Sequence, residues 1–340
     1  MKTSESEFYL PIIHNLLAGH TLSRKEARVF FSAVVRGEVP DILLAAAISA
    51  IKVRTQTVEE LVGAATALLD SATPFDSPAY EVADIVGTGG DGHNTINLST
   101  IAAITAAACG ARIIKHGNRS ISSVSGSFDF LEKLGVDFNL SPGDSWKQAN
   151  THGLCFLFAP NYHAGMRHAA NVRKTLKART IFNLLGPLVN PARPQKMLLG
   201  VADPNLVDPI AQVLQQMECE SAFVVHGSGV DEVAIHGSTM VAALKNGKIE
   251  RMEVTPADFG SETFELQELV CHDPVESHER SKGVLSGRGS DAENSAVSVN
   301  VAMLLNLFGH DDLKNNFFTS MESLAAGKPM QLVTKMAEAD

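Results

Sequence analysis

The stretch Asp84-Ile-Val-Gly-Thr-Gly-Gly-Asp-Gly-His-Asn-Thr-Ile-Asn-Leu-Ser-Thr100 decides the fold. Apolar, β-branched residues from Val82 to Val86 predict a short buried strand, and an alanine-rich run from Leu98 to Cys109 predicts a helix. Glycine backbone can bring successive amides close to a bulky anion, and the helix N-terminus adds partial positive charge. The pattern therefore predicts a strand, a phosphate-binding loop and a helix. The loop glycines are Gly87, Gly89, Gly90 and Gly92.

A tight strand-to-helix turn is the alternative for this loop, because one or two glycines can serve turn geometry alone. Four glycines together with Asp91 and the exit Asn97-Leu-Ser-Thr100 favour phosphate. Neither familiar nucleotide loop fits. No Gly-Lys-Ser/Thr ends the segment, and Gly87 to Gly92 lacks the Gly-x-Gly-x-x-Gly order with an acidic residue about 20 positions on. A P-loop and a Rossmann site are therefore excluded.

The composition is typical of a globular protein, with 45% hydrophobic and 19% charged residues in 340. No apolar run reaches the ~18 residues of a membrane span without interruption. The polar, acidic N-terminus lacks the features of a targeting peptide, so we expect a cytoplasmic protein. The cysteines are far apart in mostly apolar contexts, which favours buried free thiols over disulfides or zinc. They are Cys109, Cys155, Cys219 and Cys271.

The formal net charge of -10 opposes a general affinity for nucleic-acid backbone. The cations nevertheless gather in two places, which indicates a small, highly charged anion as ligand. Solvated helix faces are the alternative, above all for Lys174 and Lys177. The first cluster is Arg112, Lys115, His116 and Arg119, and the second is Arg167, His168, Arg173, Lys174, Lys177 and Arg179.

Residues 1 to 70 predict only helices, four short ones that end at a linker, Ser71 to Tyr80. Ser23-Arg-Lys-Glu26 and Thr57-Val-Glu-Glu60 match the capping box that begins a helix. From Glu81 onward strands alternate with helices, which predicts a mainly parallel sheet covered on both sides. We therefore expect an α/β fold with a small N-terminal α-helical domain and a larger α/β domain. The expected strands are Val82 to Val86, Ala111 to Lys115, Leu154 to Phe158, Met197 to Val201 and Ser221 to Val225, and then a hairpin, Met240 to Val254, across Asn246-Gly247.

Three further segments carry candidate chemistry. Lys115 to Ser123 follows a predicted strand with cations and small hydroxyl donors, which predicts a second phosphate-facing loop, a serine-rich surface loop being the alternative. Asp231-Glu232 follows the strand from Ser221 and the loop His226-Gly-Ser-Gly-Val230, so the two carboxylates could coordinate Mg²⁺; alone, such a pair is usually just exposed. An arginine between Tyr162 and Pro194 could hold a planar carboxylate bidentately.

Together these segments resemble the anthranilate phosphoribosyltransferase family of tryptophan biosynthesis, over nearly all of the chain. The matching segments, in family order and spacing, are Gly87-Thr-Gly-Gly-Asp91, Asn97-Leu-Ser-Thr100, Lys115-His-Gly-Asn-Arg119, Arg179-Thr-Ile-Phe-Asn-Leu-Leu-Gly-Pro187 with Asn190-Pro191, and Asp231-Glu232. The resemblance implies a nucleoside-phosphorylase-like architecture. Its helical domain spans residues 1–70, residues 165–185 return to that domain as a hinge, and a catalytic α/β domain spans residues 81–340. It also implies a homodimer joined through the helical domains, with neither nucleic acid nor membrane as partner.

The resemblance also implies the ligands. Phosphoribosyl pyrophosphate (PRPP) is expected on Gly87, Gly90, Asp91, Thr95, Asn97, Leu98, Ser99, Thr100, Lys115, His116, Gly117, Asn118, Arg119, Ser120, Ile121, Ser122, Ser123 and Ser127. Mg²⁺, as two ions of which one arrives with PRPP, is expected on Ser99, Asp231 and Glu232, and anthranilate near Gly87, Asn118 and Arg173. His116 is the candidate for proton handling, with a purely structural imidazole as the alternative. The family more often has Lys at Val124, a small residue at Phe128 and Pro-Ala at Ala164-Gly165.

The implied reaction is attack of the anthranilate amine on ribose C1 as pyrophosphate leaves, through a transition state that resembles an oxocarbenium ion. Catalysis is then expected mainly from neutralising the charge of the leaving pyrophosphate and from aligning the two substrates. A pyrimidine-nucleoside phosphorylase is the rival enzyme, opposed by Asp231-Glu232 and the stretch from Arg179 to Asn190. A nucleic-acid-binding relative without activity is the rival from another class, and it should be more basic and lack part of the PRPP and Mg²⁺ set.

Overall fold

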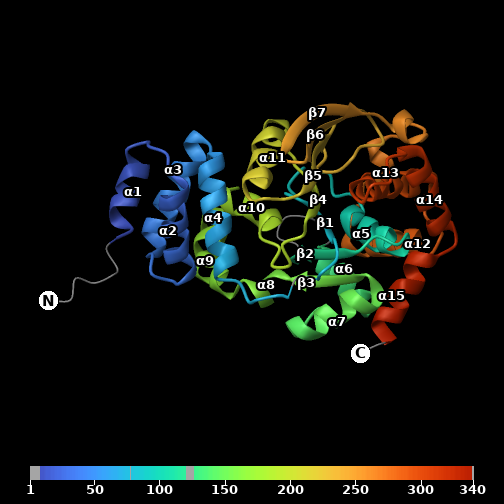
Figure 1. The fold of residues 1–340 in the computed structure, drawn as a ribbon, viewed down its shortest axis with the longest axis horizontal. Helices are drawn as coiled ribbons and strands as arrows, with labels where there is room; N and C mark the ends of the chain where they lie inside the picture. The colour runs from blue at the N-terminus through green and yellow to red at the C-terminus, as the bar shows by residue number, and fades with distance from the viewer. Residues whose placement is uncertain (1–7, 77, 120–125, 339–340) are drawn as a thin grey trace. The chain divides into compact units, whose positions relative to one another are not determined.

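The computed structural model describes residues 8–76, 78–119 and 126–338 (Figure 1). The chain divides into two compact units, Met1–Pro74 with Ala159–Pro191, and Phe75–Phe158 with Ala192–Asp340. We call them the helical unit and the α/β unit. None of the helices in the described ranges has the length and hydropathy needed to span a bilayer.

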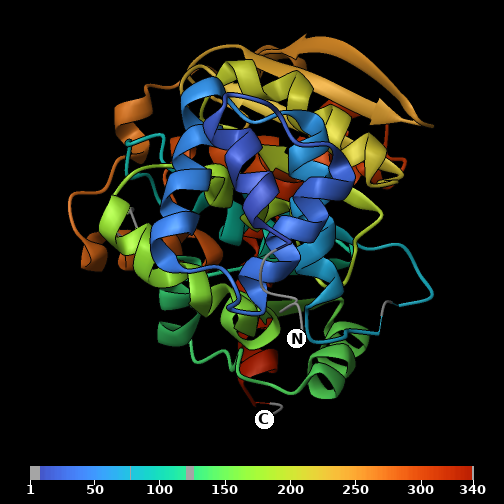
Figure 2. The same cartoon turned by 90° about the vertical axis from the view of Figure 1, so that its left-hand side faces the viewer.

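The helical unit contains the four helices predicted near the N-terminus and a later segment that packs with them (Figure 2). Its elements are α1 (Leu10–Leu17), α2 (Arg24–Val35), α3 (Asp41–Arg54), α4 (Val58–Asp70), α8 (Ala159–Tyr162), η2 (Ala164–Met166), α9 (Arg167–Leu176), α10 (Ile181–Leu185) and η3 (Gly186–Leu188). Both predicted capping boxes are confirmed, because the hydroxyls of Ser23 and Thr57 accept from the third residue of α2 and of α4. These local signals therefore set where two of the core helices begin.

Close approach of backbones defines the core of the helical unit. A Cβ atom at Gly63 of α4 would overlap the Arg24 carbonyl of α2, and one at Gly165 of η2 would overlap the Val35 carbonyl. Phe31 of α2 meets Phe182 of α10 edge to face at 5.7 Å between ring centroids. Gly165 therefore lets η2 lie closer to α2 than a residue with a Cβ atom would allow.

The α/β unit is built on one sheet, which has seven strands in the described residues, in the order β3-β2-β1-β4-β5-β6-β7. Strands β1 to β5 are parallel, as predicted, and β6 and β7 add an antiparallel edge. The predicted hairpin is confirmed, with φ of 52° at Asn246 and 69° at Gly247 in the turn. The strands are β1 (Ala83–Gly87), β2 (Ile113–Gly117), β3 (Leu154–Phe158), β4 (Lys196–Gly200), β5 (Ser221–Gly227), β6 (Thr239–Lys245) and β7 (Lys248–Val254).

Helices cover this sheet, with α11 on one side of the strands and α5 and α13 on the other (Figure 1). Residues on every side of α5 and α13 are buried; α5 is accordingly apolar and alanine-rich, whereas α13 also buries Glu293, Ser298 and Asn300. The remaining elements are α5 (Leu98–Ala108), α6 (Ser127–Lys133), α7 (Pro142–His152), η4 (Pro204–Leu206), α11 (Val207–Gln216), η5 (Pro256–Phe259), η6 (Leu266–Leu269), α12 (Pro274–Leu285), α13 (Asp291–Leu307), α14 (Leu313–Ala325) and α15 (Lys328–Glu338).

Two sequence predictions need correction. Strand β2 runs to Gly117 rather than ending at Lys115, because His116 and Gly117 continue the parallel pairing with Leu157 and Phe158 of β3. The four cysteines are free, as predicted, but only Cys155 and Cys271 are buried, whereas Cys109 and Cys219 are half-buried.

Candidate active site

The candidate site lies at the carboxyl ends of β1 and β4. These neighbouring parallel strands place Gly87 opposite Gly200 at their ends. In the strand order β2 lies next to β1 and β5 lies next to β4, so the chain leaves β1 and β4 toward opposite edges of the sheet. Open parallel sheets bind ligands at such a switch point, since the loops that follow the two strands separate there. The glycine loop follows β1 at this place.

The backbone of the glycine loop requires glycine. Gly89, Gly90 and Gly92 have φ of 63°, 79° and 83°, a region that residues with a side chain rarely adopt. The Gly89 amide donates to Asp231 Oδ2 at 2.6 Å, which ties the loop to the acidic pair. The glycines therefore serve both the turn and the close approach of a carboxylate.

The segment Asp231-Glu232 rests on three glycines at the ends of adjacent strands. A Cβ atom at Gly87 of β1 would overlap Asp231 Oδ2, and one at Gly200 of β4 would overlap the Asp231 carbonyl. A Cβ atom at Gly227 of β5 would overlap the Glu232 carbonyl. We call these three residues the glycine floor, and it fixes the acidic pair directly on the sheet.

Asp91 joins Asp231 and Glu232 in a cluster of three carboxylates, with ligand atoms within 4.8 Å of one another. Burial and the negative charges of Asp231 and Asp91 raise the pKa of Glu232 well above its ordinary value, and Lys115 opposes them. Hard oxygen donors that repel one another are suited to a divalent cation such as Mg²⁺. From the sequence, Asp91 was expected to contact PRPP only, although its place in the glycine loop could have indicated a metal ligand.

Lys115 and His116 are buried in β2, at 2% and 3% exposure. The Lys115 ammonium donates to the Ile85 carbonyl of β1. Burial lowers the pKa of Lys115 below its ordinary value, although the negative charges of Asp84, Glu232 and Asp231 oppose this shift. The His116 amide donates to Asp84 Oδ2 at 3.4 Å, and Asp84 is only 1% exposed. Sequence reasoning missed Asp84, although an acid inside an apolar strand was a readable signal.

At the start of the second loop, the Arg119 guanidinium pairs with Asp129 at 2.8 Å and Glu132 at 2.7 Å. Asn118 is exposed, and its Oδ1 accepts from the Arg119 amide at 2.8 Å. Ser127, half-buried, begins α6. Phe128 fills the core beside Gly117, where a Cβ atom would lie 3.0 Å from the ring. The candidates Ser120, Ile121, Ser122 and Ser123 lie outside the described residues.

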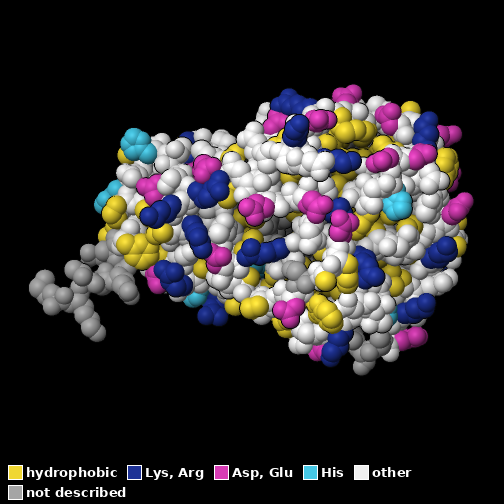
Figure 3. Space-filling model, in the orientation of Figure 1, with side chains coloured by type: hydrophobic (Ala, Val, Ile, Leu, Met, Phe, Trp, Pro, Cys, Tyr) yellow, Lys and Arg dark blue, Asp and Glu magenta, His cyan; other side chains and the backbone are white. Residues whose placement is uncertain are grey.

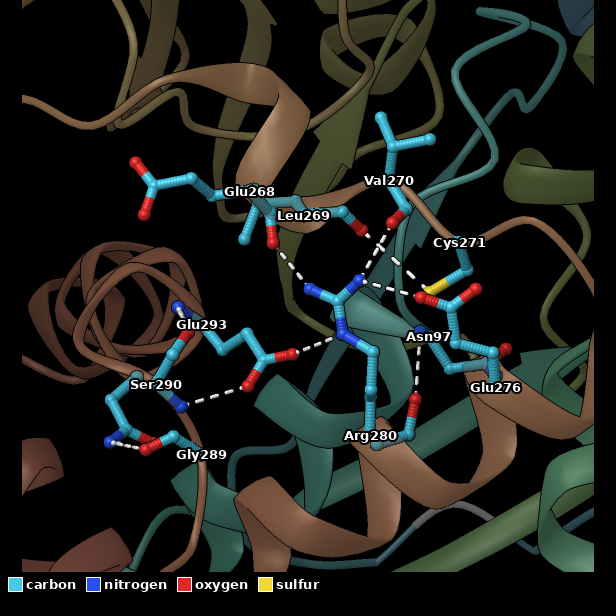
Figure 4. Close-up of polar contacts among 12 residues, drawn as sticks. Asn97, Glu268, Leu269, Val270, Cys271, Glu276, Arg280, Gly289, Ser290 and Glu293 are labelled. Atoms are coloured by element: carbon cyan, nitrogen blue, oxygen red, sulfur yellow. Dashed lines mark hydrogen bonds and ion pairs between the residues drawn. The ribbon is translucent and has the colours of Figure 1, made fainter.

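The exit of the first loop leads into α5. Thr95 and Ser99 are half-buried, whereas the side chains of Asn97, Leu98 and Thr100 are buried. Leu98 and Thr100 can therefore reach a ligand only through their backbone. Asn97 binds hydroxyls of α12, and Figure 4 shows this contact beside Arg280.

His226 is a second residue that sequence reasoning did not assign a role. Its Nδ1 lies 2.8 Å from the Val201 carbonyl, and the Gly229 amide donates to its Nε2 at 3.2 Å. Because Nε2 accepts from the Gly229 amide, Nδ1 is the ring nitrogen that donates to the Val201 carbonyl. His226 therefore holds the turn that leads from β5 to Asp231.

The residues predicted for anthranilate are divided between the units, because Arg173 belongs to the helical unit and Gly87 and Asn118 to the α/β unit. The Arg173 guanidinium lies 5.6 Å from the centroid of the Phe182 ring. Burial lowers the pKa of Arg173. Within the part of the chain that the structure describes, Arg173 makes no ion pair, so its charge suits a carboxylate ligand.

Comparison with known proteins matches both units. Residues 10–72 match the helical bundle domain of a glycosyl transferase family, and residues 79–330 match its a/b domain. Anthranilate phosphoribosyltransferase of Vibrio parahaemolyticus is 51% identical over 96% of this chain and 98% of the relative, and that of Photobacterium profundum is 51% identical over 96% of each.

Solved structures agree with these matches. Anthranilate phosphoribosyltransferase from Thermus thermophilus superposes with a TM-score of 0.90 at 34% identity, covering 96% of this chain and 98% of that one. The enzyme from Saccharomyces cerevisiae in complex with PRPP and Mg superposes with a TM-score of 0.89 at 28% identity, covering 99% of each chain. With both domains matched in order and half the residues shared with close relatives, this chain belongs to the anthranilate phosphoribosyltransferase family.

Proposed function

We propose that this protein transfers the phosphoribosyl group from PRPP to the amine of anthranilate, giving N-(5-phosphoribosyl)anthranilate and pyrophosphate in tryptophan biosynthesis. The observation that carries the proposal is the cluster of Asp91, Asp231 and Glu232 against the glycine loop. Loop amides for phosphate and carboxylates for a divalent cation are the two features that a pyrophosphate leaving group needs.

The α/β unit is proposed to bind PRPP. The backbone of Gly87, Gly90 and Asp91 and the amides of the first turn of α5 would receive the phosphates, with Thr95 and Ser99 adding hydroxyls. Lys115 supplies a buried positive charge beneath them, and Gly117, Asn118 and Ser127 line the second loop. Arg119 is proposed to contribute from its position between Asp129 and Glu132.

Asp231, Glu232 and Asp91 are proposed to hold Mg²⁺, with Ser99 as a further ligand and two ions in total. Their donor set fits, because Mg²⁺ takes oxygen ligands and bridges carboxylates to substrate phosphates. When bound, the ion supplies positive charge to the departing pyrophosphate. The glycine floor keeps Asp231 and Glu232 in place for this task.

Arg173 is proposed to hold the carboxylate of anthranilate, with Gly87 and Asn118 completing its site. Alignment of the amine with ribose C1 would then supply much of the catalysis. His116 is the proposed acceptor of the amine proton, and a pH–rate profile of His116→Asn that keeps the wild-type shape would exclude this role.

The resemblance also supports a homodimer joined through the helical domains, with residues 165–185 as the hinge between domains. Large apolar side chains on α1 and α3 are exposed, with Leu17 at 57%, Ile42 at 79% and Val53 at 88%. Burial of such residues against a second copy would stabilise a dimer. A cytoplasmic location stays a prediction from the sequence.

The decisive test is loss of anthranilate fluorescence on mixing the protein with PRPP and Mg²⁺. Release of pyrophosphate should match the loss of anthranilate one to one. Uridine with phosphate tests the phosphorylase rival, and a labelled oligonucleotide tests the nucleic-acid-binding rival. On the face in Figure 3, Lys and Arg side chains alternate with Asp and Glu, a pattern that offers no extended basic surface there. Uridine cleavage without anthranilate consumption would overturn the proposal.

A further inference from the structure

Helix α12 holds the residue that precedes α5. The Asn97 amide donates to Ser281 Oγ at 3.2 Å, and Asn97 Nδ2 donates to Ser277 Oγ at 3.4 Å. Ser277 and Ser281 are 1% and 0% exposed, and they lie one turn apart on the same face of α12. Two buried hydroxyls thus fix the end of the glycine loop.

A short strip of chain before α12 holds the residues just ahead of Asn97. The Ile96 amide donates to the Leu269 carbonyl at 3.1 Å, and the Cys271 amide donates to the Asn94 carbonyl at 2.9 Å. Thr95 and Val270 form an antiparallel bridge between these two bonds. The loop exit therefore takes its position from the strip Leu269–Cys271.

Arg280 links the strip to α12 (Figure 4). Its Nη1 donates to the Val270 carbonyl at 2.6 Å, and its Nη2 donates to the Glu268 carbonyl. These carbonyls lie at the C-terminal end of η6, where no further helical turn donates amides to them. One guanidinium thus donates hydrogen bonds to two carbonyls and holds the strip against α12.

Glu293 orients that guanidinium. Its Oε1 accepts from Arg280 Nε at 2.6 Å, while its Oε2 accepts from the Ser290 amide at 2.8 Å and caps α13. Glu293 is 5% exposed, so a helix start in the core and the loop exit share one anchoring carboxylate. Neither sequence spacing nor the family resemblance assigned a role to Arg280 or Glu293.

We propose that Arg280 is a positioning residue for PRPP, acting through the strip on Thr95, Asn97 and the first turn of α5. This inference rests on the proposed function. A loop already held in its binding geometry loses less conformational entropy when PRPP binds. Arg280 contacts the carbonyls of Glu268 and Val270 rather than the glycine loop itself, so we infer that it acts through the strip.

Arg280→Lys is the sharpest test, because lysine keeps the charge beside Glu293 but one ammonium lacks the fork that reaches both carbonyls. We expect the KM for PRPP to rise about tenfold, the loss typical of a residue that orients a ligand-binding group. The KM for anthranilate at saturating PRPP should stay within about twofold, and kcat should change less than the KM for PRPP. Calorimetric titration of PRPP with Mg²⁺, without anthranilate, measures the same weakening directly.

Two controls separate positioning from general stability. Ser290→Ala removes a cap bond of α13 without contacting the guanidinium, so it should lower the Tm and leave the KM for PRPP unchanged. Arg251→Lys alters an exposed arginine paired with Asp208 and should change neither quantity.

An Arg280→Lys variant with a lower Tm but a wild-type KM for PRPP would reduce Arg280 to a structural residue. An equal rise of both Michaelis constants would also overturn the proposal. If wild-type protein binds PRPP and Arg280→Lys binds it equally well, only this inference fails. If wild-type protein binds no PRPP, the proposed function fails with it.

Discussion

Each unit shields a carboxylate from water, Glu60 fully and Glu232 partly, and the surroundings of the two carboxylates differ. Glu60 of the helical unit is 0% exposed and accepts from the Leu22 amide at 2.8 Å, the Thr57 amide at 2.9 Å and the Arg54 guanidinium. Burial raises its pKa, but the bonds to Arg54, Thr57 and Leu22 lower it by more, so the pKa falls below its ordinary value. Glu232 of the α/β unit has two carboxylates as close neighbours, and its pKa rises.

The difference separates a structural charge from a charge kept for a ligand. The negative charge of Glu60 is balanced by Arg54 and by two backbone amides, so Glu60 contributes to stability in the absence of any ligand. Glu232 lies beside the carboxylates of Asp231 and Asp91, which disfavour its ionised form, so a cation that offsets their charge would favour it. Each of the predictions below tests one side of this contrast.

Glu60→Ala should cause the largest loss, about 3–5 kcal/mol in the free energy of unfolding, because it leaves Arg54 partly buried without its partner. Denaturant unfolding of the full chain measures it. Because the folded-state pKa of Glu60 is below 4.5, its contribution is present above about pH 4.5 and is lost as pH falls through the folded value. The control Glu59→Ala, in an exposed pair with Arg24, should cost less than about 1 kcal/mol. Equal losses in the two variants would contradict the assignment.

Asp231→Asn should lower turnover about 100-fold, or about 3 kcal/mol, because it removes charge that stabilises the departing pyrophosphate. Glu232→Gln should act alike, excess Mg²⁺ should recover part of the loss, and the KM for anthranilate should change much less. Glu253→Gln, an exposed carboxylate on β7, is the control. Wild-type turnover of both cluster variants at low Mg²⁺ would make the acidic pair a surface feature.

Arg173→Ala should raise the KM for anthranilate by one to two decades, about 1.5–3 kcal/mol, while the KM for PRPP changes far less. Unlike Arg54, Arg173 faces the Phe182 ring rather than a carboxylate, so its charge is available to the substrate acid. Lysine should substitute poorly because it lacks the planar fork. Lys174→Ala, the exposed neighbour on α9, is the control. Steady-state kinetics varying each substrate decide, and an equal rise in both constants excludes the carboxylate clamp.

Glu232→Gln should stabilise the metal-free protein by about 0.5–2 kcal/mol while it reduces activity. The sign follows from the raised pKa: ionised Glu232 destabilises the folded state at neutral pH, and this cost disappears as pH falls toward 4.5. Thermal unfolding with a chelator measures the gain, and added Mg²⁺ should remove or reverse the difference from wild type. A lower Tm of the variant without metal would show that Glu232 is structural, like Glu60.

Local signals in the sequence predicted local structure well. The capping boxes at Ser23 and Thr57, the Asn246-Gly247 turn and the glycine loop all depend on residues a few positions apart. Contacts that depend on the order of the strands in the sheet could not be predicted from such local signals. The chain gives no spacing rule that places β4 beside β1, and this pairing brings Asp231 to Gly87. Lys115 was expected at the end of a strand, and only the folded sheet shows that it is buried beside Asp84, Asp231 and Glu232.

The helical unit has a consequence for synthesis, because its chain is discontinuous. Ala159–Pro191 belongs to this unit but follows the first three strands of the sheet. At about 5–20 residues per second, the ribosome finishes α4 roughly 6–24 s before it finishes this segment. Until then Phe31 of α2 lacks Phe182, its edge-to-face partner in α10. The nascent chain therefore exposes part of its first hydrophobic core throughout that interval, when it depends most on protection from aggregation.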